Sequence, residues 1–208
     1  MVAMRALLLI DVQYDFLPGG ALAVPDGDAV IPAANRLQPA FDLVVATQDW
    51  HPRGHGSFAS SHPGKRVGEL GELAGLPQVM WPDHCVQGTR GAELAAELSQ
   101  SRVEAIFRKG TDPGIDSYSA FFDNGHRKST GLADYLRGKG VRELTMVGLA
   151  TDYCVRFSAL DARAQGFDVV VVEDACRGVE LAAGDVARAL EAVRQAGGRV
   201  VSVSSLRR

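Results

Sequence analysis

Short apolar runs alternate along this chain with longer segments of helical periodicity. The first run, residues 6–10, is apolar throughout, which is typical of a central strand covered on both faces. Further strand-like runs occupy residues 43–47, 104–108, 144–149, 169–172 and 199–203, and helix-like patterns occupy residues 28–37, 92–98, 132–138, 152–165 and 183–196. Asp28 is a candidate N-cap for the first of these helices. The alternation predicts an α/β fold, a three-layer sandwich built on six parallel strands.

Residues 52–92 break this alternation. They are rich in Gly, Pro, Ser and His and show little periodicity, and a segment this long without regular elements is usually functional. No shift in composition marks a second domain and no internal repeat is present. We therefore expect a single domain over residues 1–208, with a loop insertion at about 52–92.

Composition restricts the partners of the chain. Of its 208 residues, 46% are hydrophobic and 23% are charged, and the net charge is −3, so capture by nucleic acid or by an anionic membrane is not expected. No apolar run approaches the roughly 20 residues of a membrane-spanning helix, and Asp11 follows the first run too early for a signal peptide. The cysteines are three in number and widely spaced, as in reduced cytoplasmic proteins. A homo-oligomer is left open.

A candidate nucleophile follows the run at 144–149. Cys154 stands in the first turn of the next predicted helix, where unpaired N–H groups and the helix dipole favour a thiolate. Asp11 and Lys109 also stand at the carboxyl ends of predicted strands, and parallel strands bring those ends to one edge of the sheet. In such a cluster, Asp11 takes the thiol proton while Lys109 favours the anionic groups. Cys176 has acidic neighbours and is interpreted as a packing thiol.

Asp49 and His51 are candidate metal ligands. Their two-residue spacing puts a carboxylate and an imidazole on the same side of an extended segment. His84 is our choice for the third ligand, in competition with His55, His62 and Cys85. Zinc is the first expectation for a single divalent ion, and a mixed nitrogen and oxygen site with open positions also accepts iron or manganese. The insertion is therefore expected to be metal-binding.

Three aromatic residues lie in predicted loops around the same edge, namely Phe16, Trp81 and Tyr118. Aromatic side chains in loops often only pack beneath the loop. Here they would also stack on a flat aromatic substrate, so we expect them to line a pocket for a small molecule.

Five motifs occur together and in order along most of the chain: Asp11-Val12-Gln13-x-Asp15-Phe16, Asp49-Trp50-His51-Pro52, Trp81-Pro82-x-His84-Cys85, Lys109-Gly110 and Gly148-Leu149-Ala150-Thr151-Asp152-x-Cys154-Val155. In this combination the chain resembles the nicotinamidase (pyrazinamidase) branch of the isochorismatase-like cysteine hydrolases. The metal motifs indicate the branch, because relatives acting on isochorismate or N-carbamoyl compounds generally lack them. The resemblance implies a Rossmann-like fold and, in NAD salvage, hydrolysis of nicotinamide to nicotinate and ammonia through a cysteine thioester. It also implies activity on pyrazinamide.

The resemblance implies roles for individual residues. The implied catalytic triad is Asp11, Lys109 and Cys154. The implied metal ligands are Asp49, His51 and His84. A cis peptide between Leu149 and Ala150 is implied to aim the N–H of Ala150, with that of Cys154, into an oxyanion hole. The implied substrate-binding residues are Phe16, Trp81, Tyr118 and Leu149. Ser57 and His55 are left open as further contacts of the metal, Ser57 through a water molecule.

Three alternative functions are weighed against hydrolysis of nicotinamide. Within the same family, the alternative is an amidase for another small amide or ureido compound, and ammonia release from nicotinamide, pyrazinamide and carbamoyl substrates would decide between the two. Another is a metal-stabilised binding protein without turnover. A dinucleotide-binding oxidoreductase is disfavoured, because no G-x-G-x-x-G follows the first strand.

Overall fold

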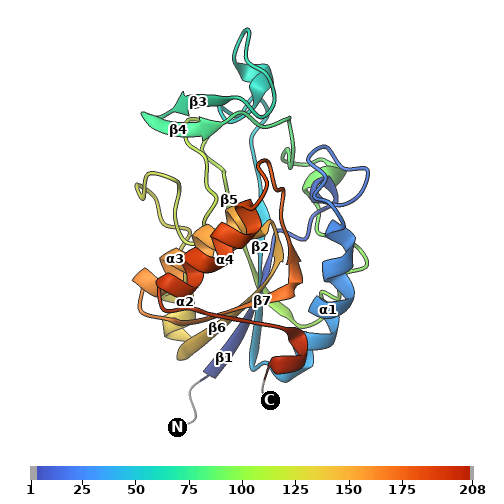
Figure 1. Cartoon of the computed structure of the whole chain (residues 1–208), viewed down its shortest axis with the longest axis vertical. Coiled ribbons are helices and arrows are strands. Elements are labelled where there is room, and N and C mark those ends of the chain that lie inside the picture. The colour runs from blue at the N-terminus through green and yellow to red at the C-terminus, as the bar shows by residue number, and fades with distance from the viewer. Residues whose placement is uncertain (1–3, 207–208) are drawn as a thin grey trace.

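The computed structural model describes residues 4–206, and a single six-stranded sheet forms its centre (Figure 1). The strands lie in the order β5 (Val103–Lys109), β2 (Leu43–Asp49), β1 (Met4–Ile10), β6 (Val141–Leu149), β7 (Asp168–Arg177) and β8 (Arg199–Val201). Every neighbouring pair is parallel. The predicted α/β fold with a six-stranded parallel sheet is confirmed.

Strand β1 is the inner strand on which the site depends. Its residues from Ala6 to Ile10 are fully buried, and it pairs with β2 on one side and β6 on the other. The chain runs outward from β1 through β2 to β5 and then returns to the opposite side of β1 as β6. Open α/β sheets bind their ligands outside the carboxyl ends of the strands at such a reversal of strand order.

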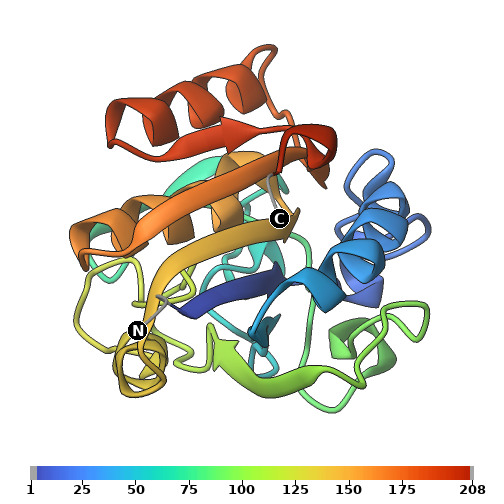
Figure 2. The same ribbon diagram turned by 90° about the horizontal axis from the view of Figure 1, so that it is seen from below.

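Different helices cover the two faces of the sheet (Figure 2). One face carries α1 (Val30–Leu37), and the other carries α2 (Leu132–Gly138), α3 (Arg156–Ala164) and α4 (Asp185–Gln195). Leu7 joins the hydrophobic cluster under α1, whereas its neighbour Leu8 joins the cluster under α2, α3 and α4. Successive residues of a strand point to opposite faces, so the continuous apolar run supplies both clusters.

Residues 92–98, predicted to be helical, are not a helix. Leu94 forms a bridge with Gln13, and the N–H of Ala95 donates to the carbonyl of Val12 at 2.9 Å. Pairing with the segment that follows β1 therefore overrides the helical propensity of this alanine-rich stretch.

The boundaries of two other predicted helices also differ. Asp28 is not an N-cap: it lies in the 3-10 turn Gly27–Ala29 that precedes α1, and α1 has no side-chain cap. The predicted helix over 152–165 begins as a π-helical turn, Thr151–Val155, before α3. Single π-helical turns of this kind are frequent at functional sites, and this one carries the candidate nucleophile.

The insertion contains a hairpin that the sequence did not indicate. Strands β3 (Leu70–Leu73) and β4 (Leu76–Val79) pair antiparallel around Ala74 and Gly75, whose φ angles are +56° and +80°. Two successive residues with positive φ are typical of the tightest hairpin turns. In Figure 1 the hairpin stands beyond the carboxyl ends of the sheet, on the side where the candidate residues gather.

Cys85, Cys154 and Cys176 are all free thiols. Within residues 4–206, no helix combines the length and the apolar character that crossing a membrane requires. The cytoplasmic location expected from reduced thiols stays a prediction.

Candidate active site and metal centre

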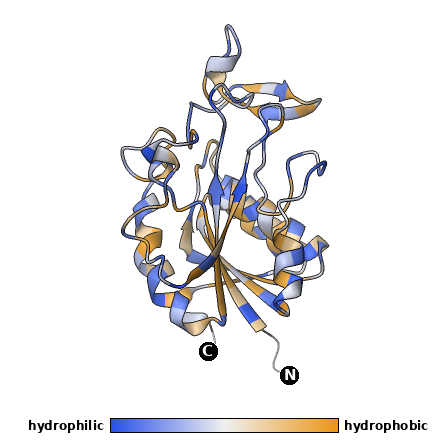
Figure 3. Ribbon diagram, turned by 180° about the vertical axis from the view of Figure 1, so that it is seen from behind, coloured by the Kyte–Doolittle hydropathy of each residue, from blue (hydrophilic) through white to orange (hydrophobic). Residues whose placement is uncertain are grey.

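Four functional side chains meet at the carboxyl edge of the sheet. Asp11 directly follows β1, Asp49 ends β2 and Lys109 ends β5, and these three strands are neighbours. Cys154 comes from the turn after β6, on the other side of β1. In Figure 3, two strands change from apolar to polar colouring at their arrowheads, which marks this edge.

Lys109 is the centre of the charge network. Its Nζ lies 2.9 Å from Asp11 Oδ2, donates to Asp49 Oδ1 and donates to the carbonyl of Ser117 at 3.0 Å. The same nitrogen lies 3.4 Å from Sγ of Cys154. The lysine is only 2% exposed. Two carboxylates thus share one ammonium inside the protein, and one negative charge is left for a further cation.

Asp11 is held in place by Thr47. The Thr47 hydroxyl donates to Asp11 Oδ1 at 2.7 Å, and the N–H of Asp11 donates to Thr47 Oγ1 at 3.2 Å. The other oxygen of Asp11 faces Lys109. One carboxylate oxygen each of Asp11 and Asp49 and the sulfur of Cys154 lie within 4.8 Å of one another. A proton acceptor therefore lies close to the thiol.

Burial and charge set the protonation states of this cluster. Burial alone would lower the pKa of Lys109, but Asp11 and Asp49 outweigh burial and raise that pKa well above its ordinary value. Burial raises the pKa of Asp11, with Lys109 opposing and Asp49 adding to the effect. Burial also raises the pKa of Cys154 well above its ordinary value, with Lys109 opposing and Asp11 and Asp49 adding. The prediction that the helix terminus favours a resting thiolate is therefore wrong, because desolvation dominates.

The turn that carries Cys154 follows a cis peptide bond between Leu149 and Ala150, as the resemblance implies. The carbonyl of Ala150 accepts the N–H groups of Tyr153 and Val155, both at 3.1 Å. Among the turn and loop hydrogen bonds of the described chain, the N–H groups of Ala150 and Cys154 donate none. The oxyanion hole that the resemblance implies for these two N–H groups stays a prediction.

Asp49, His51 and His84 form the candidate metal centre. The Nε2 atoms of His51 and His84 lie 3.7 Å and 3.9 Å from Asp49 Oδ2. Nδ1 of His51 lies 2.9 Å from the carbonyl of Gly110, and Nδ1 of His84 lies 2.8 Å from the carbonyl of Pro82. A carbonyl can only accept, so each Nδ1 carries the proton and each Nε2 keeps a lone pair. This set of one carboxylate and two imidazoles fits a divalent metal.

Two residues support the metal ligands from behind. The side chain of Gln13 accepts the N–H of Asp49 at 2.8 Å and donates to the carbonyl of Asp49 at 2.8 Å. Both backbone polar groups of Asp49 are therefore hydrogen-bonded to one side chain. Gly110 has a φ of +65°, and a Cβ there would lie 2.3 Å from Cε1 of His51. Only glycine lets the backbone come close enough for its carbonyl to hold the imidazole.

The competing candidate ligands, His55, His62 and Cys85, are placed differently. His55 Nε2 lies 2.8 Å from the carbonyl of Asp112 and therefore donates, while Nδ1 pairs with Ser57 Oγ at 2.8 Å. Neither nitrogen is free in this arrangement, although His55 lies beside His51 with ring centroids 4.4 Å apart. His62 Nε2 pairs with the carbonyl of Gly56. Among the described residues, neither His62 nor Cys85 belongs to a group that could hold a metal.

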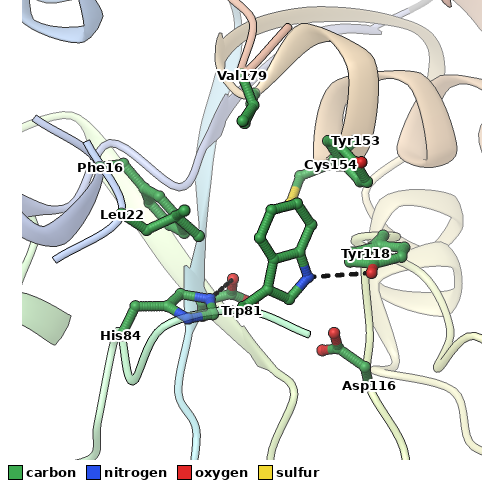
Figure 4. A pocket seen from close by; sticks show the side chains of 11 residues that line it. Phe16, Leu22, Trp81, His84, Asp116, Tyr118, Tyr153, Cys154 and Val179 are labelled. Atoms are coloured by element: carbon green, nitrogen blue, oxygen red, sulfur yellow. Dashed lines mark hydrogen bonds and ion pairs between the residues drawn. The ribbon is translucent and has the colours of Figure 1, made fainter. Parts of the chain in front are cut away.

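A pocket opens above these residues (Figure 4). It is lined by Phe16, Leu22, Asp49, Trp81, His84, Asp116, Tyr118, Ala150, Tyr153, Cys154 and Val179. Nε1 of Trp81 donates to the hydroxyl of Tyr118 at 3.1 Å, which fixes two aromatic walls relative to each other. Phe16 lies against His84 with ring centroids 5.6 Å apart. Leu149 is not among the lining residues, since its side chain is fully buried in the cluster under α1.

Four lining residues were not singled out from the sequence: Leu22, Asp116, Tyr153 and Val179. Tyr153 packs edge-on against Trp81 at 4.9 Å and against Tyr118 at 5.3 Å, so it completes the aromatic wall. Asp116 is buried, and its Oδ2 accepts from Gln78 at 2.9 Å. Of these four residues, only Tyr153 could have been found from the sequence, because it directly precedes the candidate nucleophile. Leu22, Asp116 and Val179 lie in loops without periodicity.

Comparison with known proteins places these features in a family. The isochorismatase domain matches residues 5–205. The nicotinamidase of Escherichia coli is 51% identical over 204 residues, which cover 96% of this chain and 95% of that protein. The solved structure of a nicotinamidase and pyrazinamidase from Acinetobacter baumanii superposes with a TM-score of 0.95 at 45% identity and 99% coverage of both chains. Pyrazinamidase of Pyrococcus horikoshii, solved in complex with zinc, gives a TM-score of 0.78 at 40% identity, covering 96% of this chain and 99% of that one.

These matches extend over nearly the whole chain and include the strands, the turn of Cys154 and the insertion. They confirm the resemblance drawn from the five motifs. The chain therefore belongs to the isochorismatase family of hydrolases, in the branch that contains the nicotinamidases.

Proposed function

We propose that this chain hydrolyses nicotinamide to nicotinate and ammonia through a thioester on Cys154. The observation that supports this most directly is the buried thiol 3.4 Å from Lys109, in a cluster with Asp11 and at the wall of an aromatic pocket. The relatives named as nicotinamidases reach 51% identity. The aromatic walls suit a flat ring, and the thiol cluster suits attack on an amide carbon.

Acylation begins with transfer of the thiol proton to Asp11. The raised pKa of Asp11 makes this carboxylate a stronger base than an exposed one, and Lys109 stabilises the thiolate as it forms. The sulfur lone pair attacks the carboxamide carbon, and the carbonyl π electrons move onto oxygen. The N–H groups of Ala150 and Cys154 donate to that oxyanion.

Collapse of the tetrahedral species breaks the C–N bond. Protonated Asp11 gives its proton to the departing nitrogen, which leaves as ammonia, and the acyl group remains on Sγ. Water then gives a proton to Asp11 and adds to the thioester carbon. The C–S bond breaks, Asp11 returns its proton to the sulfur, and nicotinate is released.

Asp49, His51 and His84 are proposed to hold one divalent metal, with zinc as the first choice and iron or manganese as alternatives. The donor set supports this, as does the zinc in the Pyrococcus horikoshii relative. A metal bound there supplies a coordination position that orients the pyridine nitrogen of the substrate. His84 also lines the pocket, so the metal centre and the ring share one wall.

Pyrazinamide is proposed as a second substrate. It keeps the planar ring and the carboxamide, and the Acinetobacter relative carries both activities in its name. A homo-oligomer stays a prediction, for which the mass in solution is the measurement.

Ammonia release from nicotinamide tests the function, with pyrazinamide and an N-carbamoyl compound in parallel. We expect turnover of the first two, loss of turnover after treatment with a chelator, and no turnover by Cys154→Ala. The matched variant Cys176→Ala, a thiol of the core outside the pocket, should stay active. Preference for the carbamoyl compound would assign the chain to another amidase, and nicotinamide binding without any turnover would make it a binding protein.

A further inference from the structure

A buried carboxylate outside the catalytic cluster joins the nucleophile turn to a loop far along the chain. Asp152 stands two residues before Cys154 in the same turn and is 5% exposed. Its Oδ1 accepts the N–H of Val179 at 2.9 Å, and its Oδ2 accepts the N–H of Glu180 at 2.7 Å. Both oxygens are therefore used on the loop that follows β7, and such charge-assisted bonds are the strong ones.

The loop itself, residues 178–184, is held closely against this carboxylate. A Cβ on Gly178 would lie 2.1 Å from Cγ2 of Val186 and 3.1 Å from Asp152 Oδ1, so there is no room for a side chain. Glu180 has a φ of +54° and accepts the N–H groups of Gly184 and Val186 at 2.6 Å and 2.9 Å. The loop is thus fastened to the start of α4 on one side and to Asp152 on the other.

Val179 is the residue of this loop that reaches the pocket. It lines the cavity together with Ala150 and Cys154, and Figure 4 shows it on the side of the cavity from which Cys154 projects. It also packs against the hydrophobic cluster that contains Phe16. Because Asp152 and Cys154 belong to one short turn, the two hydrogen bonds fix the distance between the Val179 wall and the nucleophile.

We propose that Asp152 is a positioning residue, which sets the Val179 wall against the reacting end of the substrate and thereby controls substrate binding. The inference rests on the proposed function, because it concerns how that amide is seated. The role is mechanical: the carboxylate acts through the backbone of Val179 and Glu180 and takes no part in proton transfer. A wall displaced from the nucleophile weakens binding of a small planar amide before it alters the chemistry on the sulfur.

Steady-state kinetics of the metal-loaded protein with nicotinamide test this role. Asp152→Asn should raise KM about tenfold and change kcat less than about threefold, because an amide supplies one acceptor for two N–H donors. Gly178→Ala disturbs the same contact from the loop side and should raise KM in the same way. The matched control Asp185→Asn alters a carboxylate that also accepts a backbone N–H of this segment, that of Ala182, but lies outside the pocket, so its KM should be unchanged.

A double-mutant cycle separates action through Val179 from a general loosening. If Asp152 acts through that wall, Val179→Ala should raise KM in the wild-type background and add little in the Asp152→Asn background. An unchanged KM in both Asp152→Asn and Gly178→Ala would overturn the inference, as would multiplicative effects in the cycle or a loss confined to kcat. Should Asp152→Asn fail to fold, Gly178→Ala combined with Val179→Ala completes the same cycle. An inactive wild-type protein would instead contradict the proposed function.

Discussion

Nζ of Lys109 lies 3.4 Å from Sγ of Cys154, and neither residue is more than 6% exposed. The lysine is nevertheless already paired with Asp11 and Asp49, which share its single positive charge. The thiol therefore meets a cation that is already paired, in surroundings from which water is largely excluded. This explains why burial rather than the ammonium determines the resting state of the sulfur.

The first prediction concerns the reactivity of this thiol. In the protein without substrate, Cys154 should react slowly with iodoacetamide at pH 7, and the rate should rise as the pH passes above 9, because the pKa of Cys154 is raised well above 9.0. Asp11→Asn removes a charge and a hydrogen-bond partner that both raise this pKa, so labelling at a given pH should become faster. Mass spectrometry of the peptides distinguishes Cys154 from Cys85 and Cys176. Rapid labelling of Cys154 that titrates below pH 8 would restore the helix-terminus interpretation.

The second prediction concerns stability. Lys109→Met leaves the carboxylates of Asp11 and Asp49 buried without their ammonium, and breaking a buried pair in this way typically costs about 3–5 kcal/mol. Urea unfolding of the metal-free protein at pH 7 measures the loss. The raised pKa of Lys109 means that its stabilisation is complete below the unfolded value of about 10.4 and is lost only as the pH rises through the folded value.

The variant should also lose stability as the pH rises, but in a lower pH range. Without Lys109 the pKa values of the two carboxyl groups rise, so their ionisation opposes folding and Lys109→Met should become more stable as the pH falls from 7 to 5. Lys139→Met removes an exposed pair with Glu104 and serves as the control, with little change expected. Equal losses in the two variants would show that the buried network contributes nothing of its own.

Elements whose residues are buried were easier to predict from the sequence than exposed ones. The run at 6–10 identified β1 because a strand covered on both faces leaves no position for a polar residue. The hairpin around Ala74 and Gly75 was not predicted, because its strands are only four residues long, Leu70 is exposed, and the turn lacks the usual Asn-Gly signal. At 92–98 the alanines indicated a helix, but long-range pairing of Leu94 with Gln13 decided the outcome.

Some residues of the site could be predicted from the sequence and others could not. Asp11 and Lys109 were predictable because each follows or ends a predicted strand, and parallel topology places such residues together. Asp49 was predictable from its two-residue spacing to His51. Asp116 and Val179 were not, because their loops have no period from which a direction can be read. The protonation state of Cys154 was also beyond the sequence, since desolvation is a property of the folded chain.

The third prediction concerns the metal centre. Asp49→Ala removes the carboxylate that faces both imidazoles, so the purified variant should contain little metal by elemental analysis. His62→Ala is the control: its Nε2 pairs with the carbonyl of Gly56, outside the three-ligand group, and the variant should keep its metal. A full metal complement in Asp49→Ala would place the ion elsewhere.

The fourth prediction tests the backbone behind His51. In Gly110→Ala the new Cβ would lie 2.3 Å from Cε1 and 2.6 Å from Nδ1 of His51, so the imidazole has to move away from the carbonyl that orients it. Loss of such an orienting contact typically lowers metal affinity by about 10–100-fold, measurable by competition with a chelator. Activity should recover when excess metal is added, because the catalytic cluster of Asp11, Lys109 and Cys154 is untouched.

Gly88→Ala provides the matched control for that variant. Gly88 also has a positive φ, +76°, but a Cβ there would meet nothing within 4 Å. Both substitutions therefore bear the cost of placing alanine in a left-handed conformation, about 1–2 kcal/mol, and only Gly110→Ala presses on a metal ligand. Equal metal affinity in the two variants would show that the close approach of residue 110 to His51 does not hold the imidazole in place. If only Gly110→Ala loses metal affinity, the close approach of residue 110 is what orients the imidazole of His51.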